Sequence, residues 1–380
     1  MSILRFTSAA AFFCVGLSGI WGCSGSDSGN GPPDGGSPPS NSSIIFMPYV
    51  DALVWMPNTP IGTALGTNYF DVAKARQASG TQFFMVGFVN AYSSSPVING
   101  NPPTPATGGQ CAPGWGNGPR FTVEEDPAGV KNQLVALRKA GGDAGVSFGA
   151  WGQELASACA SATELQAAYQ RVINYLGVTW FDFDMEGFTA TDAAANTRRA
   201  TALKALQVAN PGLRVSFTLP ASPNTAFPPI AYWPWGYPAG GALTEALNAG
   251  VDVGGFGCMT MDYGGDCPSN DYFLCTQQTV AKCVSTIQSL GKYSTSDQAA
   301  ARLMVTPMIG QQDSAGQVLT LDNAQKLTSW LKTAYPKGIL ALSAWNANRD
   351  QSCSIGNWIC SGVDGLAPWA YSNAFQQISK

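Results

Sequence analysis

Two kinds of hydrophobic pattern alternate along the chain. Short apolar runs rich in branched and aromatic residues predict buried β-strands, and longer stretches with apolar positions every three to four residues predict amphipathic helices. The strands are expected at residues 50–55, 83–89, 145–150, 179–186, 214–219, 253–261, 303–309 and 339–345. The clearest helical stretches are residues 128–140, 161–175, 193–209, 243–249, 279–290 and 322–334.

Regular alternation of strands and helices predicts parallel strands joined by right-handed crossovers. Eight such units over roughly 330 residues fit an α/β fold of the (β/α)₈ TIM-barrel type, a single catalytic domain with extended loops. The first two helices have the weakest pattern, because residues 93–120 are mostly Pro, Gly and Asn. A doubly wound open sheet is the alternative, but no glycine-rich nucleotide loop follows the first strand.

Composition narrows the chemistry. The 380 residues are 45% hydrophobic and 12% charged, with a net charge of −4 and scattered basic residues, so no nucleic-acid partner is expected. The chain has no histidine. This excludes Ser-His-Asp and Cys-His hydrolases and every histidine-ligated metal site. Carboxylates, tyrosines and hydroxyls must therefore carry any reaction.

The start of the chain is typical of a bacterial export signal, with Arg5 before a mostly apolar run over residues 6–20. Residues 20–23 resemble a lipobox ending in Cys23, the candidate for lipidation, although Trp21 is unusual there. Ordinary secretion with cleavage nearby is the alternative. Residues 24–43 form a Gly/Ser/Pro/Asp tether.

We therefore expect an export segment at 1–23, a flexible tether at 24–43 and a catalytic domain at 44–380. The mature protein would be secreted or lipid-anchored at the bacterial cell surface, and would meet a membrane only through that anchor. No other segment has the uninterrupted apolar length of a membrane span. We expect a monomer.

Eight of the ten cysteines lie beyond the export segment, and an even number in an exported chain indicates disulfides. Cys353 with Cys360, and Cys267 with Cys275, are the expected local pairs, while the remaining connectivity is left open. A zinc cluster is the alternative, but the spacings contain no Cys-x-x-Cys pair.

Three acidic residues alternate within one apolar strand. Asp182, Asp184 and Glu186 fall on one face of the strand over residues 179–186, because side chains of a strand alternate between faces. Neighbouring carboxylates about 6–7 Å apart raise each other's pKa values. The alternatives are a solvated polar face or a structural ion network. We favour an acid–base site with Glu186 at the carboxyl end of the strand, because such barrels place their active sites there.

Other polar side chains follow the ends of later predicted strands. The sixth, seventh and eighth strands are followed by Asp262, Tyr263, Gln311, Asp313, Asn346, Asn348, Arg349 and Asp350, with Trp345 closing the eighth. All of these residues are expected at one end of the barrel.

These motifs resemble glycoside hydrolase family 18, the chitinases and their relatives. The run Asp182-Phe183-Asp184-Met185-Glu186 resembles the family's D-x-x-D-x-D-x-E signature. Ser147-Phe148-Gly149 resembles its S-x-G-G motif, with Ala150 at the last position, and Met261-Asp262-Tyr263 resembles its M-x-Y motif. Trp345 resembles the tryptophan that lies beneath the scissile sugar.

The chain departs from the family pattern at two places. Thr179 and Trp180 stand where the signature has its first aspartate and its glycine. Gly264 follows Tyr263 where many members have a sugar-binding aspartate, for which Asp262 or Asp266 would substitute.

The resemblance implies a substrate-assisted retaining mechanism that needs no cofactor and no metal. Glu186 would protonate the glycosidic oxygen and then activate water. Asp184 would bind the acetamido nitrogen, and Asp182 would share a proton with Asp184. Tyr263 would donate its hydroxyl to the acetamido oxygen, whose carbonyl attacks the anomeric carbon to form an oxazolinium intermediate.

Sugar rings have apolar faces, so tryptophans are natural contacts, although most tryptophans are packing residues. The residues expected to bind substrate are Trp345, Trp151, Ser147, Gly149, Met261, Asp262 and Gln311. Weaker aromatic candidates are Trp55, Trp115, Trp233, Trp235, Tyr237 and Trp358.

The expected activity is hydrolysis of β-1,4-linked N-acetylglucosamine polymers, chitin and chito-oligosaccharides. Mostly one helix separates the last two predicted strands, so the cleft should be open, which favours endo cleavage. The alternatives are an endo-β-N-acetylglucosaminidase acting on glycoprotein glycans, and a catalytically inactive, lectin-like barrel that binds chitin.

Overall fold

The structure is a computed structural model that describes residues 44–93, 109–116, 121–150, 154–186, 192–226, 241–269, 271–353, 356 and 359–380. The expected export segment and tether, with Cys23, lie outside the described residues. So do the aromatic candidates Trp151, Trp233, Trp235, Tyr237 and Trp358.

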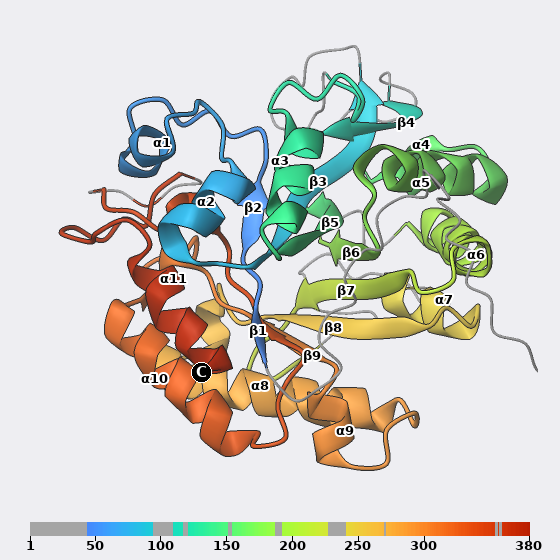
Figure 1. The fold of residues 1–380 in the computed structure, drawn as a ribbon. Coiled ribbons are helices and arrows are strands. Elements are labelled where there is room, and N and C mark those ends of the chain that lie inside the picture. The colour runs from blue at the N-terminus through green and yellow to red at the C-terminus, as the bar shows by residue number, and fades with distance from the viewer. Residues whose placement is uncertain are drawn as a thin grey trace, which may run out of the picture. The chain divides into compact units, whose positions relative to one another are not determined.

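A ring of parallel strands forms the centre of the fold (Figure 1). Its members in hydrogen-bonded order are β3 (Phe83–Ser93), β5 (Asp143–Ala150), β6 (Trp180–Met185), β7 (Arg214–Pro220), β8 (Val253–Met259), β9 (Leu303–Thr306) and β12 (Ala341–Leu342). β1 (Ile45–Phe46) pairs with β12, and β2 (Tyr49–Asp51) pairs with β3. Only Met47 and Pro48 separate β1 from β2, so these are two halves of one strand, and this strand closes the sheet. The predicted (β/α)₈ barrel is confirmed.

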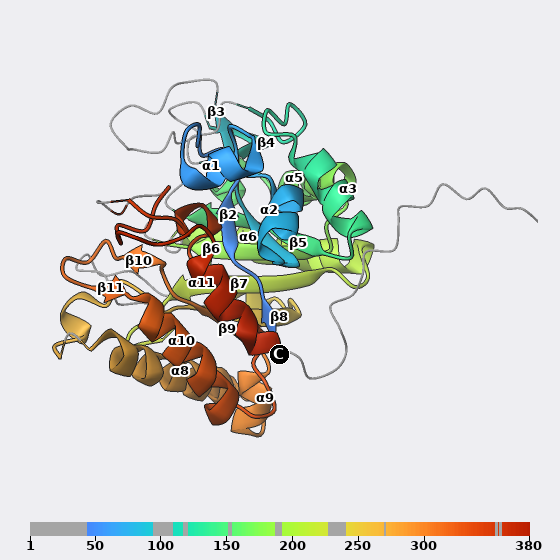
Figure 2. The ribbon, with the colours of Figure 1, turned by 60° about the vertical axis from the view of Figure 1, so that its left-hand side comes forward.

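Helices lie on the outer side of the ring, between successive strands (Figures 1 and 2). They are α1 (Pro60–Leu65), α2 (Val72–Ser79), α3 (Val130–Lys139), α4 (Leu155–Ala158), α5 (Ala162–Leu176), α6 (Ala193–Ala209), α7 (Ala242–Asn248), α8 (Tyr272–Ser289), α9 (Ser296–Ala300), α10 (Leu321–Ala334) and α11 (Ala370–Phe375). Figure 2 shows α8, α10 and α11 running beside one another. Side-chain caps such as Asp192 on α6 satisfy amide groups that a helix start leaves unpaired.

Two apolar layers hold this arrangement together. The larger lies between the strands and the helices, where Phe148, Phe181 and Phe183 pack with Tyr169 of α5. The smaller fills the inside of the barrel and contains Ile45, Met47, Tyr49, Met85, Phe88, Ala150, Trp180, Met304 and Ala341. The alternation predicted for residues 179–186 therefore holds, with Phe181, Phe183 and Met185 outside the barrel and the acidic residues, like Trp180, inside it.

Several element boundaries differ from the prediction. The first strand occupies residues 45–51 instead of 50–55, because Pro48 interrupts the apolar run and conceals its continuity. α8 begins at Tyr272, seven residues before its predicted start at 279. An additional strand, β4 (Gly109–Trp115), runs antiparallel to β3, and a ribbon of β10 (Gly310–Gln311) and β11 (Val318–Leu319) follows β9.

Four disulfides staple the loops and helices. The two expected pairs, Cys353–Cys360 and Cys267–Cys275, are confirmed. The remaining cysteines pair as Cys111–Cys159, between β4 and the end of α4, and Cys258–Cys283, between β8 and α8. All eight cysteines of residues 44–380 are therefore used in disulfides, which rules out the zinc alternative and is typical of an oxidising compartment.

Within the described ranges, none of the helices has both the length and the apolar character needed to cross a bilayer.

Candidate active site

The acidic ladder is built from strand register. Asp182 of β6 is paired with Ser147 of β5 on one side and with Ser216 of β7 on the other. Two residues further along, Asp184 is paired with Gly149 and Thr218 in the same way. Glu186 directly follows β6. The three acidic side chains therefore follow one another along the inner face of the barrel toward the carboxyl ends of its strands.

Hydroxyl groups surround the lowest acid of this ladder, Asp182, which is fully buried. Tyr49 and Ser147 each donate to Oδ2 at 2.8 Å, while Ser216 at 2.6 Å and Thr218 at 3.0 Å donate to Oδ1. Burial raises the pKa of Asp182, and these hydrogen bonds oppose the rise because they favour the carboxylate. Ser147 was predicted to bind substrate, but it is fully buried beside Asp182, where it supports the acid, and it does not line the cavity described below.

Asp184 lies one layer higher and is 6% exposed. Its Oδ1 has no hydrogen-bond partner among the described residues. Burial, then the charges of Glu186 and Asp182, raise its pKa well above the ordinary value. Gly149 is needed for this packing, since a Cβ there would lie 2.1 Å from the Asp184 carbonyl oxygen and its φ is 102°. Gly149 was predicted to contact the sugar, but it packs against the backbone of Asp184 and does not line the cavity described below.

Glu186 is partly exposed at the top of the ladder. Burial raises its pKa to about 7, with further contributions from the charges of Asp262 and Asp313. A carboxyl group with this pKa still holds a proton near neutral pH, which a general acid requires.

A cavity of about 860 Å³ opens above Asp184 and Glu186. Its carboxylates are Asp51, Asp184, Glu186, Asp262 and Asp313. Its other walls include Phe88, Trp115, Phe121, Thr218, Met259, Met261, Thr306, Met308 and Trp345. Trp345 is held by aromatic neighbours, with its ring centroid 5.5 Å from that of Phe88 and 6.2 Å from that of Tyr49. Three predicted substrate contacts, Trp345, Met261 and Asp262, therefore line the cavity.

Sequence reasoning missed Asp51 as a site residue. It ends β2 and lines the cavity, and burial raises its pKa to about 6 against the opposing hydrogen bonds from the backbone of Leu53 and Val54. The prediction placed it inside a strand at 50–55. With the strand correctly ending at Asp51, an acidic residue at a carboxyl end of the barrel would have been the signal.

The structure does not bring Tyr263 to the cavity. The residue is 4% exposed, its hydroxyl is hydrogen-bonded to Thr276 Oγ1 at 2.9 Å, and its ring packs on Tyr272. Asp262 has a φ of 50°, and this left-handed turn directs the following side chain into the helix layer.

The M-x-Y motif fits this structure better two residues earlier. Met259-Thr260-Met261-Asp262 has the same spacing, and Met259, Met261 and Asp262 all line the cavity. In this register Met261 stands where the family has tyrosine, and Asp262 stands where it has the sugar-binding aspartate. The sugar-binding aspartate seemed to be missing at Gly264 only because the motif was first matched to Met261-Asp262-Tyr263.

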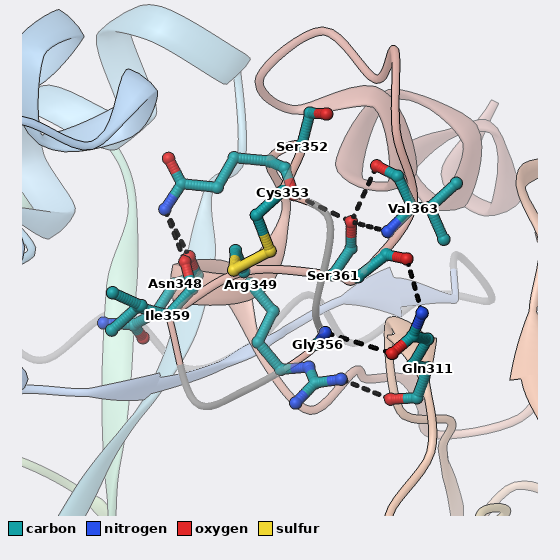
Figure 3. Close-up of a disulfide and its surroundings, with 12 residues drawn as sticks. Gln311, Asn348, Arg349, Ser352, Cys353, Gly356, Ile359, Ser361 and Val363 are labelled. Carbon is teal, nitrogen blue, oxygen red and sulfur yellow. Dashed lines mark hydrogen bonds between the residues drawn. A yellow bond between two sulfur atoms is a disulfide. The ribbon is translucent and has the colours of Figure 1, made fainter.

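Gln311 is also used structurally (Figure 3). Its Nε2 donates to the Gly362 carbonyl at 2.7 Å, and its Oε1 accepts from the Gly356 amide at 3.1 Å. Its own carbonyl accepts from the guanidinium of Arg349. The amide oxygen thus holds Gly356, between Cys353 and Cys360, and the amide nitrogen holds Gly362, just beyond Cys360, and the predicted sugar contact is not supported.

No family model matches the chain. A probable bifunctional chitinase/lysozyme of Escherichia coli is 28% identical over 257 residues, which cover 63% of this chain and 26% of that protein. Endochitinase 11 of Metarhizium anisopliae is 28% identical over 236 residues, 59% of this chain and 43% of that protein. The chain therefore spans less than half the length of the relatives that it matches.

Solved structures share the fold. The catalytic domain of a hyperthermophilic chitinase from Pyrococcus furiosus superposes with a TM-score of 0.67 at 22% identity, covering 89% of this chain and 97% of that one. Catalytic-site mutants of active domain 2 of the thermostable chitinase from the same organism, complexed with chito-oligosaccharides, also give 0.67, at 23% identity and with 89% and 95% covered.

A closed parallel barrel whose fourth strand carries acidic residues toward a cavity at its carboxyl end shares its fold with these chitinase structures. The predicted resemblance to glycoside hydrolase family 18 is confirmed by the chitinases among these relatives and by the shared fold.

Proposed function

We propose that this protein hydrolyses β-1,4-linked N-acetylglucosamine polymers, namely chitin and chito-oligosaccharides. The observation that carries the proposal is Glu186, whose pKa is raised to about 7, facing the cavity directly above Asp184. The names of the relatives support the same substrate class. The same fold and acid would serve an endo-β-N-acetylglucosaminidase, which is the second candidate.

In the proposed reaction, protonated Glu186 donates its proton to the glycosidic oxygen as the bond to the anomeric carbon breaks. The leaving sugar departs with that proton. Glu186, now a carboxylate, takes a proton from the incoming water, which attacks the anomeric carbon. One residue is thus acid in the first step and base in the second.

The resemblance to the family implies that the substrate supplies its own nucleophile. The 2-acetamido carbonyl oxygen attacks the anomeric carbon and forms an oxazolinium ion with overall retention. Asp184 accepts a hydrogen bond from the acetamido nitrogen through its unpartnered Oδ1, and its proton is shared with Asp182.

Substrate binding is proposed to use Trp345 as the floor beneath the scissile sugar and Asp262 as a hydroxyl ligand. Trp151 stays a predicted contact. The segment from β9 to β12, which is described throughout, holds a short ribbon and α10, so the cleft has no high wall on this side. This openness supports endo action.

The domain limits stay proposals: residues 1–23 for export, 24–43 as a tether and 44–380 as the catalytic domain. The four disulfides support a location outside the cytoplasm. Lipidation at Cys23 and a monomeric state belong to the same proposal.

The test is hydrolysis of the chitin hexamer by the protein and by Glu186→Gln, with the anomer of the fresh product read by NMR. We expect β-anomer release by the protein and a loss of at least 10³-fold in kcat by the variant, because the proton donor is gone. Circular dichroism checks that the variant is folded.

Other outcomes separate the candidates. Binding of the hexamer without cleavage would favour the lectin-like barrel. Release of glycan from a glycoprotein, with the hexamer untouched, would favour the endo-β-N-acetylglucosaminidase. Turnover by Glu186→Gln at the level of the unmodified protein would remove Glu186 as the acid.

A further inference from the structure

Trp180 stands at the base of the acidic ladder, where the family signature has glycine. It lies two residues before Asp182 on β6, so its side chain shares the inner face of the barrel with the acids. Its indole Nε1 donates to Ser216 Oγ at 2.9 Å. The side chain is 7% exposed, and the Arg214 guanidinium lies 4.5 Å from its ring centroid.

Trp180 also separates two spaces. A second cavity of about 420 Å³ lies at the amino ends of the strands and is lined by Trp180 together with Ile45, Met47, Phe83, Thr179 and Arg214, among others. Asp182, on the other side of the indole, is fully buried and does not line this cavity. The indole thus lies between the base cavity and the acid.

The direction of the hydrogen bonds follows from the chemistry of the donors. An indole N–H can only donate, so Ser216 must accept from Trp180. The single proton of the Ser216 hydroxyl then has one acceptor among the described residues, Asp182 Oδ1 at 2.6 Å. This is the shortest of the four contacts to the acid, and it is the only one whose direction a donor-only group fixes.

The other hydroxyls are less constrained. Tyr49 and Thr218 lie 2.7 Å from each other as well as within reach of Asp182, and each has one proton. While Asp182 is ionised it donates no proton, so these two protons cannot form all three hydrogen bonds, namely Tyr49 to Asp182, Thr218 to Asp182 and Tyr49 to Thr218. Ser216 is therefore the donor on which the carboxylate form of Asp182 depends most.

We propose that Trp180 is a positioning residue for the hydrolysis proposed above: it fixes Ser216 as a hydrogen-bond donor to Asp182 and closes the barrel interior beneath the acidic ladder. This inference deepens the proposed function and rests on it. It gives a role to Trp180, which stands where the family signature has glycine.

Loss of the indole N–H would free a lone pair of the Ser216 hydroxyl, which could then accept a hydrogen bond from protonated Asp182. Asp182 would bind a proton more readily, so the coupled pair of Asp182 and Asp184 would take up its second proton, and lose its remaining charge, at a higher pH. The titratable groups facing Asp182 are Tyr49 from β2 and Asp184 from its own strand, while β5 and β7 supply the hydroxyls. The acidic limb of the pH profile should therefore move to higher pH.

The experiment compares Trp180→Phe with the unmodified full-length protein, because phenylalanine keeps an aromatic ring and removes the N–H. We expect the acidic limb of kcat to shift to higher pH and kcat at the optimum to fall about two- to tenfold, the effect of one lost hydrogen bond. The matched control is Trp330→Phe on α10, where the ring packs against Phe273 and Tyr335 outside the barrel. It should leave the pH profile unchanged.

A second readout does not need activity. Carboxyl carbons of ¹³C-labelled aspartate, assigned with Asp182→Asn, report the titration of Asp182 by NMR, and Trp180→Phe should move it to higher pH. Ser216→Ala should give the same shift, and the double variant should add nothing, because both substitutions remove one chain of donors.

The outcomes distinguish the two proposals. If the protein hydrolyses the hexamer but Trp180→Phe leaves both the acidic limb and the Asp182 titration unchanged, the inference is overturned and the proposed function stands. If the protein does not hydrolyse the hexamer, the proposed function fails, and the NMR titration still decides whether Trp180 controls Asp182. Should Trp180→Phe not fold, benzothienylalanine at position 180, which replaces only the N–H by sulfur, carries the same comparison.

Discussion

At the scale of single residues, the charges around Glu186 determine the pH at which it can work. Asp262 follows β8 and Asp313 lies between β10 and β11, and their charges add to the effect of burial. Because Glu186 acts in its protonated form, activity is present below its pKa and is lost as the pH rises through about 7. The basic limb of kcat/KM should therefore lie near neutral pH.

Asp313→Asn removes one of these charges while keeping the size of the side chain. The pKa of Glu186 should then fall from about 7 toward its ordinary value near 4.5, so the basic limb of kcat/KM should move to lower pH. Asp322→Asn is the control, because Asp322 is exposed on α10 and paired with Lys326. Measured pH profiles with coincident basic limbs for all three proteins would show that Asp313 has no influence on the acid.

At the scale of elements, the local sequence pattern correctly predicted which side chains of a regular strand face the inside of the barrel. β6 is regular from Trp180 to Met185, so period-two alternation correctly placed the acids inside the barrel. Tyr263 was predicted in the site from its place after a strand and from the M-x-Y motif, but the left-handed turn at Asp262 directs it away from the cavity. The pattern of hydrophobic and polar positions does not reveal a single residue with positive φ.

Long-range contacts account for the other misses. The hydroxyl of Tyr49 reaches Asp182 from 133 residues away, and the amide of Gln311 is engaged by Gly362, 51 residues further along the chain. Neither contact has a local signature, since each depends on the closed ring or on a disulfide-bonded loop. The two short-range disulfides, in contrast, could be predicted from spacing, whereas the pairing of Cys111 with Cys159 could not.

The disulfides offer a prediction at this scale. Replacing Cys258 and Cys283 by alanine opens a link of 25 residues between β8 and α8, and should lower the free energy of unfolding by about 3.5 kcal/mol. Replacing Cys267 and Cys275, 8 residues apart, should cost about 2.5 kcal/mol, because a shorter loop restricts the unfolded chain less. Guanidinium denaturation of both variants measures the difference, and a larger loss for the shorter link would contradict the entropic argument.

At the scale of the whole molecule, ring closure depends on a very short segment. β1 is two residues long, yet it supplies the edge that β12 needs, and Met47 continues the pairing through its N–H to Leu342. Ser343 Oγ also donates to the Met47 carbonyl at 2.6 Å. Residues 45–47 therefore hold β12, the last strand of the ring, in place.

Two truncations test this. A chain starting at residue 44 should unfold with the same midpoint as the full-length protein. A chain starting at residue 49 loses the buried side chains of Ile45, Phe46 and Met47, and its free energy of unfolding should fall by about 5 kcal/mol. Thermal unfolding followed by circular dichroism gives the comparison, and equal midpoints for all three chains would show that β1 is dispensable.

The contact between Met47 and Ser343 joins residues 296 positions apart, which has a consequence for biosynthesis. During translation the first strand emerges 296 residues before its partner on one side. The nascent chain therefore keeps an open sheet edge until β12 has been synthesised, because contacts of high sequence separation form late. A chain that has not yet closed its barrel can still pass through a membrane channel, as the proposed export segment would require.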